Sequence, residues 1–257
     1  MSEGVDPKSG VDEIVGESPA LRQALASAKR LALSDVAMLI VGERGSGKEL
    51  FARVIHRISA RRNKSFVKVQ VAATDRELLE RDLFGDQKAA LEGAPKGKIG
   101  ALELSDKGTL FLDEVARLPL PLQAKLVSVL NRAEIEGSGA TRTIPVNVRL
   151  IAATRHNFDE LVPKNRLHGD LHDQFKTSFI QIPPLRERQE DIPLLARYFL
   201  HKFARRMNRQ IGTIPSETMD ALRNYGWPGN VAQLENFIER SVILTTGLKL
   251  KAPLDEL

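Results

Sequence analysis

The chain has 257 residues, with 38 Lys and Arg against 33 Asp and Glu, a formal net charge of +5, and no cysteine. A hydrophobic content of 42% supplies enough apolar side chains for a packed core, which excludes a wholly disordered chain. The lack of cysteine excludes disulfides, cysteine-ligated zinc and cysteine nucleophiles. The chain also has no run of about 18 apolar residues, so no transmembrane helix is predicted. The mild positive charge permits an anionic partner without specifying one.

Strands and helices are expected to alternate up to the two prolines at 183 and 184. The polar segment 1–12 is expected to be a flexible leader. Apolar residues at helical spacing predict a helix over 20–33, and the continuous run VAMLIV predicts a buried strand over 36–41. Glycines follow at once, and a second helix is expected over 49–59. The order strand, glycine loop, helix is typical of the first unit of an α/β fold.

The rest of the chain continues this pattern and then changes character. Further strands are expected at 66–71, 109–112, 146–153 and 179–182, with a helix at 122–132. They predict the α/β fold class, a parallel sheet with helices on both faces. Beyond the prolines only helices are predicted, at 191–207, at 216–225 with Ser216 as the cap, and at 231–245. We therefore expect a leader at 1–12, an α/β core at 13–184 and a small all-helical subdomain at 185–257.

A phosphate-binding loop is predicted directly after the first strand, where the sequence reads GERGSGK. Its glycines allow successive backbone N–H groups to face inward, and the following helix presents its N-terminus to the same point. Together with the ammonium of the loop lysine, these donors form a cradle for phosphates. The nucleotide-binding residues are expected to be Gly42, Glu43, Arg44, Gly45, Ser46, Gly47, Lys48 and Glu49. Glu49 stands where such loops usually place a Ser or Thr ligand for magnesium.

An acidic pair is predicted at the carboxyl end of a later strand, in the segment GTLFLDE. Ligands bind at that edge of a parallel sheet, so both motifs point to one crevice. Asp113 is expected to hold Mg²⁺, directly or through water, and Glu114 to polarise the attacking water. The two motifs together predict a site for a nucleoside triphosphate.

Several longer segments resemble the AAA+ domain of sigma-54-dependent transcription activators, the bacterial enhancer-binding proteins. They are GERGSGKE, LFLDEV, LPLPLQAKL, VNVRLIAAT, PPLRERQEDIPLLA and WPGNVAQLENFIERSVIL, and they occur in the order found in that family. The resemblance covers the chain from about residue 15 to residue 250. It implies a P-loop NTPase core of the AAA+ type, followed by a helical lid. It also implies ATP and Mg²⁺ as cofactors.

The resemblance further implies a cytoplasmic protein that assembles into a hexameric or heptameric ring. Such a ring would use ATP turnover to remodel the complex of RNA polymerase with sigma-54. The helix-turn-helix that this family normally carries is not among these residues, so specific DNA binding is not expected, and neither is a membrane partner.

The sequence departs from the family at its working positions. The loop that contacts the polymerase reads GAFTGA in the family, and here it is formed by Ala89, Ala90, Leu91, Glu92, Gly93 and Ala94. A carboxylate in place of the small threonine is expected to weaken contact with sigma-54. The switch and sensor positions are expected at Gln70, Thr154, Arg155 and Ala232. Gln70 stands where the family has Asn, Arg155 where it has Asn, and Ala232 where it has Arg.

The arginine-finger positions are also changed. His168 and Gln174 occupy the places of two arginines, and neither is a permanently charged, bidentate donor. The candidates for replacing a lost arginine are Arg155, Arg166, Lys176, Arg186 and Arg188. Two interpretations stay open: an ATPase that activates sigma-54 transcription, and a catalytically degenerate module that binds ATP and oligomerises with little hydrolysis. A small-molecule kinase is disfavoured, because it has no need of the PPLRERQEDIPLL or WPGN segments.

Overall fold

The computed structural model describes residues 14–71, 75–85, 99–136 and 143–256, so the expected leader lies outside the described residues. The chain divides into two compact units, which we treat separately. One, here called the lid unit, comprises Met1–Ala26, Gly42–Lys48 and Ile182–Leu257. The other, here called the sheet unit, comprises Ser27–Val41 and Glu49–Gln181. The glycine loop thus belongs with the C-terminal helices, although it follows the first strand in the chain.

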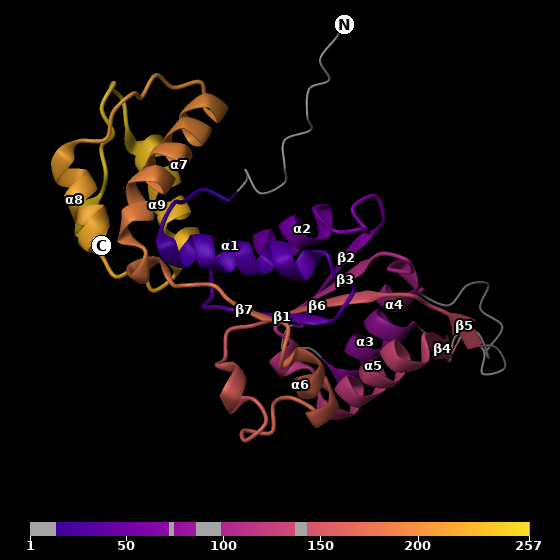
Figure 1. Ribbon diagram of the computed structural model, residues 1–257. Helices are drawn as coiled ribbons and strands as arrows, with labels where there is room; N and C mark the ends of the chain where they lie inside the picture. The colour runs from indigo at the N-terminus through magenta and orange to yellow at the C-terminus, as the bar shows by residue number, and fades with distance from the viewer. Residues whose placement is uncertain (1–13, 72–74, 86–98, 137–142, 257) are drawn as a thin grey trace, which may run out of the picture. The chain divides into compact units, whose positions relative to one another are not determined.

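The sheet unit contains a five-stranded parallel sheet with the strand order β2-β3-β6-β1-β7 (Figure 1). The strands are β1 (Met38–Val41), β2 (Phe66–Gln70), β3 (Thr109–Asp113), β6 (Arg149–Thr154) and β7 (Phe179–Gln181). Every residue of β1 and β6 is buried, which explains why β1 is a continuous apolar run and why β6 is apolar between Arg149 and Thr154. The predicted parallel sheet is confirmed. The fourth predicted strand began too early, because the ladder starts at Arg149 and not at 146.

Helices cover both faces of the sheet, as predicted (Figure 1). On one face lies α2 (Lys48–Arg57). On the other lie α3 (Arg76–Phe84), α4 (Ala101–Leu104), α5 (Leu120–Arg132) and α6 (Gly169–Phe175). Fully buried side chains such as Leu83, Leu112, Leu126 and Phe175 form one core cluster on the second face. Burial of each such side chain contributes about 1.5–3 kcal/mol to folding.

The prediction missed several short elements of this unit. They are α3, α4, α6 and the two-stranded antiparallel pair of β4 (Glu134–Glu136) and β5 (Thr143–Pro145). Elements of three or four residues leave too few positions for a period of 2 or 3.6 to show. The nine-residue α3 carries charged residues at most of its positions and buries only Leu79, Leu83 and Phe84.

The C-terminal part of the lid unit is helical, with α7 (Ile192–Arg206), α8 (Ser216–Asn224) and α9 (Asn230–Leu244). These helices enclose the fully buried Trp227, whose Nε1 donates to the Leu222 carbonyl at 2.7 Å. Ser216 was expected to cap α8, and this is wrong: it is the first helical residue, Pro215 takes the cap position, and no side chain caps the helix. No helix of the described ranges is long and apolar enough to cross a membrane.

At the amino edge of the sheet, a buried guanidinium joins three segments. Arg61 donates to both carboxylate oxygens of Asp35, at 2.9 and 2.7 Å, and to the carbonyls of Gly108 and Asn147, at 2.9 and 2.7 Å. The residues that it contacts lie directly before β1, β3 and β6. One side chain therefore fixes where three neighbouring strands begin.

We predict that Arg61→Met destabilises the protein by about 2–4 kcal/mol, because the substitution removes the guanidinium from the Asp35 carboxylate and from the carbonyls of Gly108 and Asn147. Urea unfolding of the two proteins measures the difference. Arg62→Met is the matched control, since Arg62 is exposed, and we expect it to change stability by less than about 0.5 kcal/mol. Equal effects of the two substitutions would show that Arg61 does not bear this role.

Candidate functional site

The carboxyl edge of the sheet brings three predicted site residues into adjacent positions. In the register of the parallel ladder, Gln70 at the end of β2 pairs with Asp113 at the end of β3. Asp113 in turn pairs with Ala153 of β6, and Thr154, the next residue, pairs with the last residue of β1. The glycine loop continues the chain directly from β1. The acidic pair thus ends β3 and the glycine loop follows β1, with β6 between these two strands.

Glu114 follows Asp113 in a left-handed backbone conformation, with φ 63° and ψ 50°. Non-glycine residues adopt this conformation at a cost, and such residues cluster at functional sites. The turn ends β3 abruptly and begins a short 3-10 helix (Val115–Arg117). Asp113 is therefore the last residue of the strand, and Glu114 is the turn residue that follows it.

His156, which was not predicted as a site residue, lies close enough to Glu114 for the two charges to interact. His156 Nε2 is 3.0 Å from Nη1 of Arg166, so the guanidinium donates to a neutral imidazole. Burial lowers the pKa of His156, the neighbouring cations Arg166 and Arg155 lower it further, and Glu114 acts in the opposite direction. This residue follows the sensor segment by one position, but a lone histidine after a strand gave no signal of its own.

The expected arginine-finger segment is fastened by a buried amide. Gln123, which is fully buried, donates through Nε2 to the carbonyls of Leu118 and Arg166, at 2.8 and 3.0 Å. Its Oε1 accepts from the backbone N–H of His168 at 2.9 Å. The segment 166–168 is thus tied to the loop that follows Asp113 and Glu114. Gln123 lies in the LPLPLQAKL motif, and sequence reasoning assigned it no role.

The two finger positions hold no guanidinium. His168 occupies the N-cap position of α6 without a side-chain capping bond, and its Nδ1 lies 3.8 Å from an Asp170 carboxylate oxygen. Gln174 donates from its side-chain amide to Asn131 of α5 at 3.1 Å. Both side chains therefore contact their own sheet unit.

In the lid unit, the glycine loop is folded around Lys48. This lysine is 8% exposed, and its ammonium donates to the carbonyls of Gly42 and Glu43, at 2.8 and 3.2 Å. Gly45 and Gly47 have φ of 76° and 103°, a region that suits glycine alone among common residues. The Ser46 hydroxyl is buried, and within the described part of the chain it has no hydrogen-bond partner. An unpartnered buried hydroxyl beside a lysine is a polar group left for a ligand.

Residues of the lid hold the loop from the other side. Arg186 forms a bidentate ion pair with the Glu43 carboxylate, at 2.9 and 2.7 Å. Asn230 donates to the same carboxylate at 3.0 Å and to the Arg44 carbonyl at 3.1 Å. The hydrogen bond from Arg186, followed by that from Asn230, lowers the pKa of Glu43. Asn230 ends the WPGN motif, in a left-handed conformation with φ 54°.

The sensor position Ala232 lies against the same loop. Its backbone N–H donates to the Gly45 carbonyl at 3.2 Å, and a Cβ added at Gly45 would lie 3.0 Å from the Ala232 Cβ. Arg188, only 3% exposed, donates to the Ser46 carbonyl at 3.3 Å. Burial lowers the pKa of Arg188, and the nearby Asp191 opposes that shift.

The other predicted site residues are Glu49, Arg155 and those of the partner loop. Glu49 pairs with Arg53 and Lys68, at 2.7 and 2.5 Å, so its carboxylate is directed to cations of the sheet unit. Arg155 is exposed. The predicted partner loop, residues 89–94, lies outside the described residues.

Two family models match the chain in sequence. One, described as the sigma-54 interaction domain, matches residues 14–181, and the other, described as the AAA+ ATPase lid domain, matches residues 186–253. The chain belongs to the sigma-54 interaction domain family of AAA+ ATPases. This confirms both the family resemblance and the fold class, a P-loop core with a helical lid domain.

Relatives of this sigma-54 interaction domain are activators of transcription. The DNA-binding transcriptional activator HyfR of Escherichia coli is 47% identical over 255 residues, which are 99% of this chain and 38% of HyfR. The Nif-specific regulatory protein of Bradyrhizobium diazoefficiens is 44% identical over 237 residues, which are 92% of this chain and 40% of that protein. The chain thus spans about two fifths of the length of these relatives.

A solved structure supports the same assignment. NtrX from Brucella abortus in complex with ADP matches with a TM-score of 0.85 at 35% identity, covering 95% of this chain and 54% of NtrX. NtrX in complex with ATP matches with a TM-score of 0.83 at 36% identity, covering 91% of this chain and 51% of NtrX.

We predict that the His156 side chain titrates below the ordinary histidine value of about 6.5. Since its pKa is lowered, His156 is neutral at neutral pH and favours folding there; this contribution is lost as the pH falls from the ordinary value through the lowered one. Arg166→Ala removes one cause and should raise the pKa. NMR titration of the His156 ring measures both values. Arg117→Ala, at an exposed arginine, is the control, and a pKa of His156 that Arg166→Ala leaves unmoved would contradict the interaction.

Proposed function

We propose that this chain binds ATP with Mg²⁺, assembles into a ring and couples the nucleotide cycle to remodelling of RNA polymerase bound to sigma-54. The observation that carries the proposal is the glycine loop, which surrounds the Lys48 ammonium and leaves the Ser46 hydroxyl without a partner among the described residues. Complexes of NtrX with ADP and with ATP support the same ligand for this chain. In functional terms we divide the chain into a leader at 1–12, a core at 13–184 and a lid at 185–257.

The loop residues account for phosphate binding. Lys48 donates to two carbonyls of its own loop, and a phosphate oxygen is a stronger, charged acceptor that would take over those bonds. Ser46 would add its hydroxyl, and the left-handed glycines let backbone N–H groups face the ligand. The N-terminus of α2 adds a favourable dipole for an anion.

Magnesium fits the donor set at the carboxyl edge of the sheet. Asp113, at the end of β3, offers the carboxylate oxygens that Mg²⁺ prefers, while Glu49 is paired with two cations. When bound, Mg²⁺ would neutralise charge on the phosphates. Glu114, in the left-handed turn after the strand, would accept a proton from the attacking water.

A second candidate function is a nucleotide-gated assembly module with slow hydrolysis. The observation that favours it is the lack of a guanidinium at both expected finger positions, where His168 stands at the start of α6 and Gln174 donates to Asn131. An arginine at such a position accelerates phosphoryl transfer by about 10³-fold or more. Ala232 likewise offers the nucleotide no side-chain donor.

Most of the candidates for replacing a lost arginine already form hydrogen bonds or ion pairs with other residues. Arg166 donates to His156, Arg186 to Glu43, and Lys176 pairs with Asp173 at 3.2 Å. Arg188 is buried and donates to the carbonyl of Ser46. Each would lose a favourable contact before it reached a phosphate, which supports slow turnover.

The test of slow turnover is one variant that carries His168→Arg, Gln174→Arg and Ala232→Arg. We expect ATP turnover to rise by on the order of a hundredfold, because a charged donor would again stabilise the transferred phosphoryl group. Release of phosphate at saturating ATP measures the rate. Asn63→Arg with Asn224→Arg adds arginine at exposed positions and should leave the rate unchanged.

The same measurements distinguish the two candidates. Micromolar binding of ATP with slow turnover and a gain in the restored variant supports the degenerate module. Brisk turnover that rises with protein concentration supports the active ATPase. A wild-type protein that binds ATP no better than Lys48→Ala contradicts both.

A further inference from the structure

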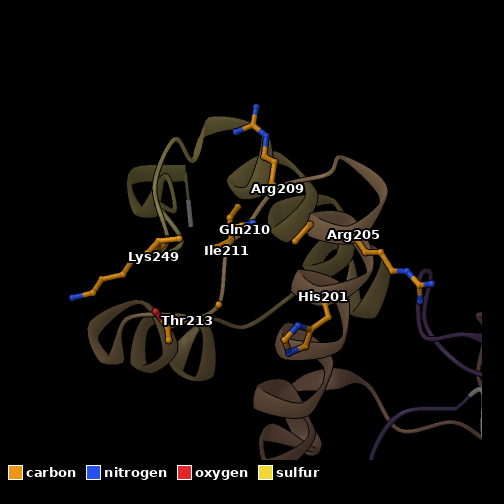
Figure 2. A pocket seen from close by; sticks show the side chains of 10 residues that line it. His201, Arg205, Arg209, Gln210, Ile211, Thr213 and Lys249 are labelled. Carbon is orange, nitrogen blue, oxygen red and sulfur yellow. The ribbon is translucent and has the colours of Figure 1, made fainter.

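The lid unit contains an open surface pocket of about 560 Å³, here called the cavity, that the nucleotide chemistry does not use (Figure 2). It lies between the C-terminal half of α7 and two chain segments, 209–213 and 248–249. Backbone hydrogen bonds join those segments: Gly212 N–H to the Leu248 carbonyl at 3.0 Å and Leu250 N–H to the Thr213 carbonyl at 2.9 Å. The walls are therefore fixed by the backbone.

The cavity is lined by cations and by no carboxylate. Arg205, Arg209 and Lys249 are exposed, and within the described part of the chain none of them is within ion-pair distance of an Asp or Glu. Their neighbours on α7 behave differently. Lys202 pairs with Glu235 at 2.7 Å, and Arg206 pairs with a glutamate of α9. The lid thus neutralises one side of α7 and leaves positive charge around the cavity.

The direction of these side chains indicates the shape of a ligand. Figure 2 shows Arg205, Arg209 and Lys249 extending to different sides of the hollow. Arg209 is held in place because its guanidinium donates to the carbonyl of Thr245. Cations that diverge in this way cannot close on one small anion. They suit an extended ligand that carries several negative charges.

The interior of the cavity is apolar. Ala204 and Ile211 are each 5% exposed, and Leu248 is 69% exposed at the edge. The exposed leucine offers apolar area that a bound side chain could remove from water. The sugars of a nucleic acid backbone offer only small C–H faces to such a floor, whereas a peptide can insert a whole aliphatic side chain.

We propose that this cavity docks an extended acidic peptide segment of a partner protein. One apolar side chain of the segment enters the hollow against Ile211 and Leu248, while flanking Asp or Glu side chains pair with Arg205, Arg209 and Lys249. Binding is accordingly strongest at low salt, because the ion pairs are solvent-exposed.

The experiment uses the whole chain without nucleotide, and a short fluorescein-labelled peptide in which Asp and Glu flank one Leu. Fluorescence anisotropy measures its affinity. We expect Arg205→Glu with Lys249→Glu to weaken binding about tenfold or more, since two exposed attractions become repulsions. Leu248→Ser, and separately a peptide with Ser in place of its Leu, should each weaken binding as well.

Charge-matched variants decide the outcome. Arg62→Glu with Arg132→Glu changes two exposed arginines of the sheet unit, neither of which lines the cavity, and should leave affinity within about twofold, because distant surface charges are screened. Thermal unfolding midpoints show that all variants fold. Equal weakening by the two double variants, no binding of the peptide, or binding of duplex DNA through Arg205 and Lys249 in place of the peptide would each overturn the proposal. Because no nucleotide is present, these results are independent of ATP binding and turnover.

Discussion

The hold of the lid residues on the glycine loop is the interaction on which the rest of the site depends. Glu43 of the loop accepts from Arg186 and Asn230, and the Ala232 N–H donates to the Gly45 carbonyl. A glycine loop alone has many conformations, and ordering each residue costs about 1–2 kcal/mol of entropy. These contacts meet that cost before any ligand arrives. They also couple the loop to the lid, so a change in one carries to the other, as gating by a γ-phosphate requires.

In the sheet unit, the buried side chain of Gln123 holds the segments around the acidic pair in place. The Gln123 amide joins the loop after Asp113 and Glu114 to the backbone at Arg166 and His168. A buried amide with all these partners is costly to disrupt, because each orphaned group loses about 1–3 kcal/mol. Within the sheet unit, the acidic pair and the segment at the finger positions are thereby held in a fixed relation. The backbone of the segment 166–168 is thus fixed, and the residues at the two expected finger positions are His168 and Gln174.

Long apolar elements and motifs with a fixed order were predictable from the sequence. The strands β1, β3 and β6, the helices α5, α7 and α9, and the glycine loop were predicted within a few residues of their observed bounds. Short elements such as α4 and β4 were missed because they have too few residues for a period. Contacts such as Glu43 with Arg186 join residues far apart in the chain, and no local pattern announces them. His156 had no signal because its environment is supplied by Arg166 and Glu114.

The most direct test of the account is a crystal structure of the chain with a non-hydrolysable ATP analogue and Mg²⁺. The account predicts the triphosphate within the loop 42–48, with the Lys48 ammonium donating to phosphate oxygens instead of the carbonyls of Gly42 and Glu43. It also predicts that the Ser46 hydroxyl gains a phosphate partner and that Mg²⁺ lies on the Asp113 carboxylate, directly or through water. An analogue bound elsewhere, or a loop that keeps Lys48 on its own carbonyls at saturating analogue, would contradict it.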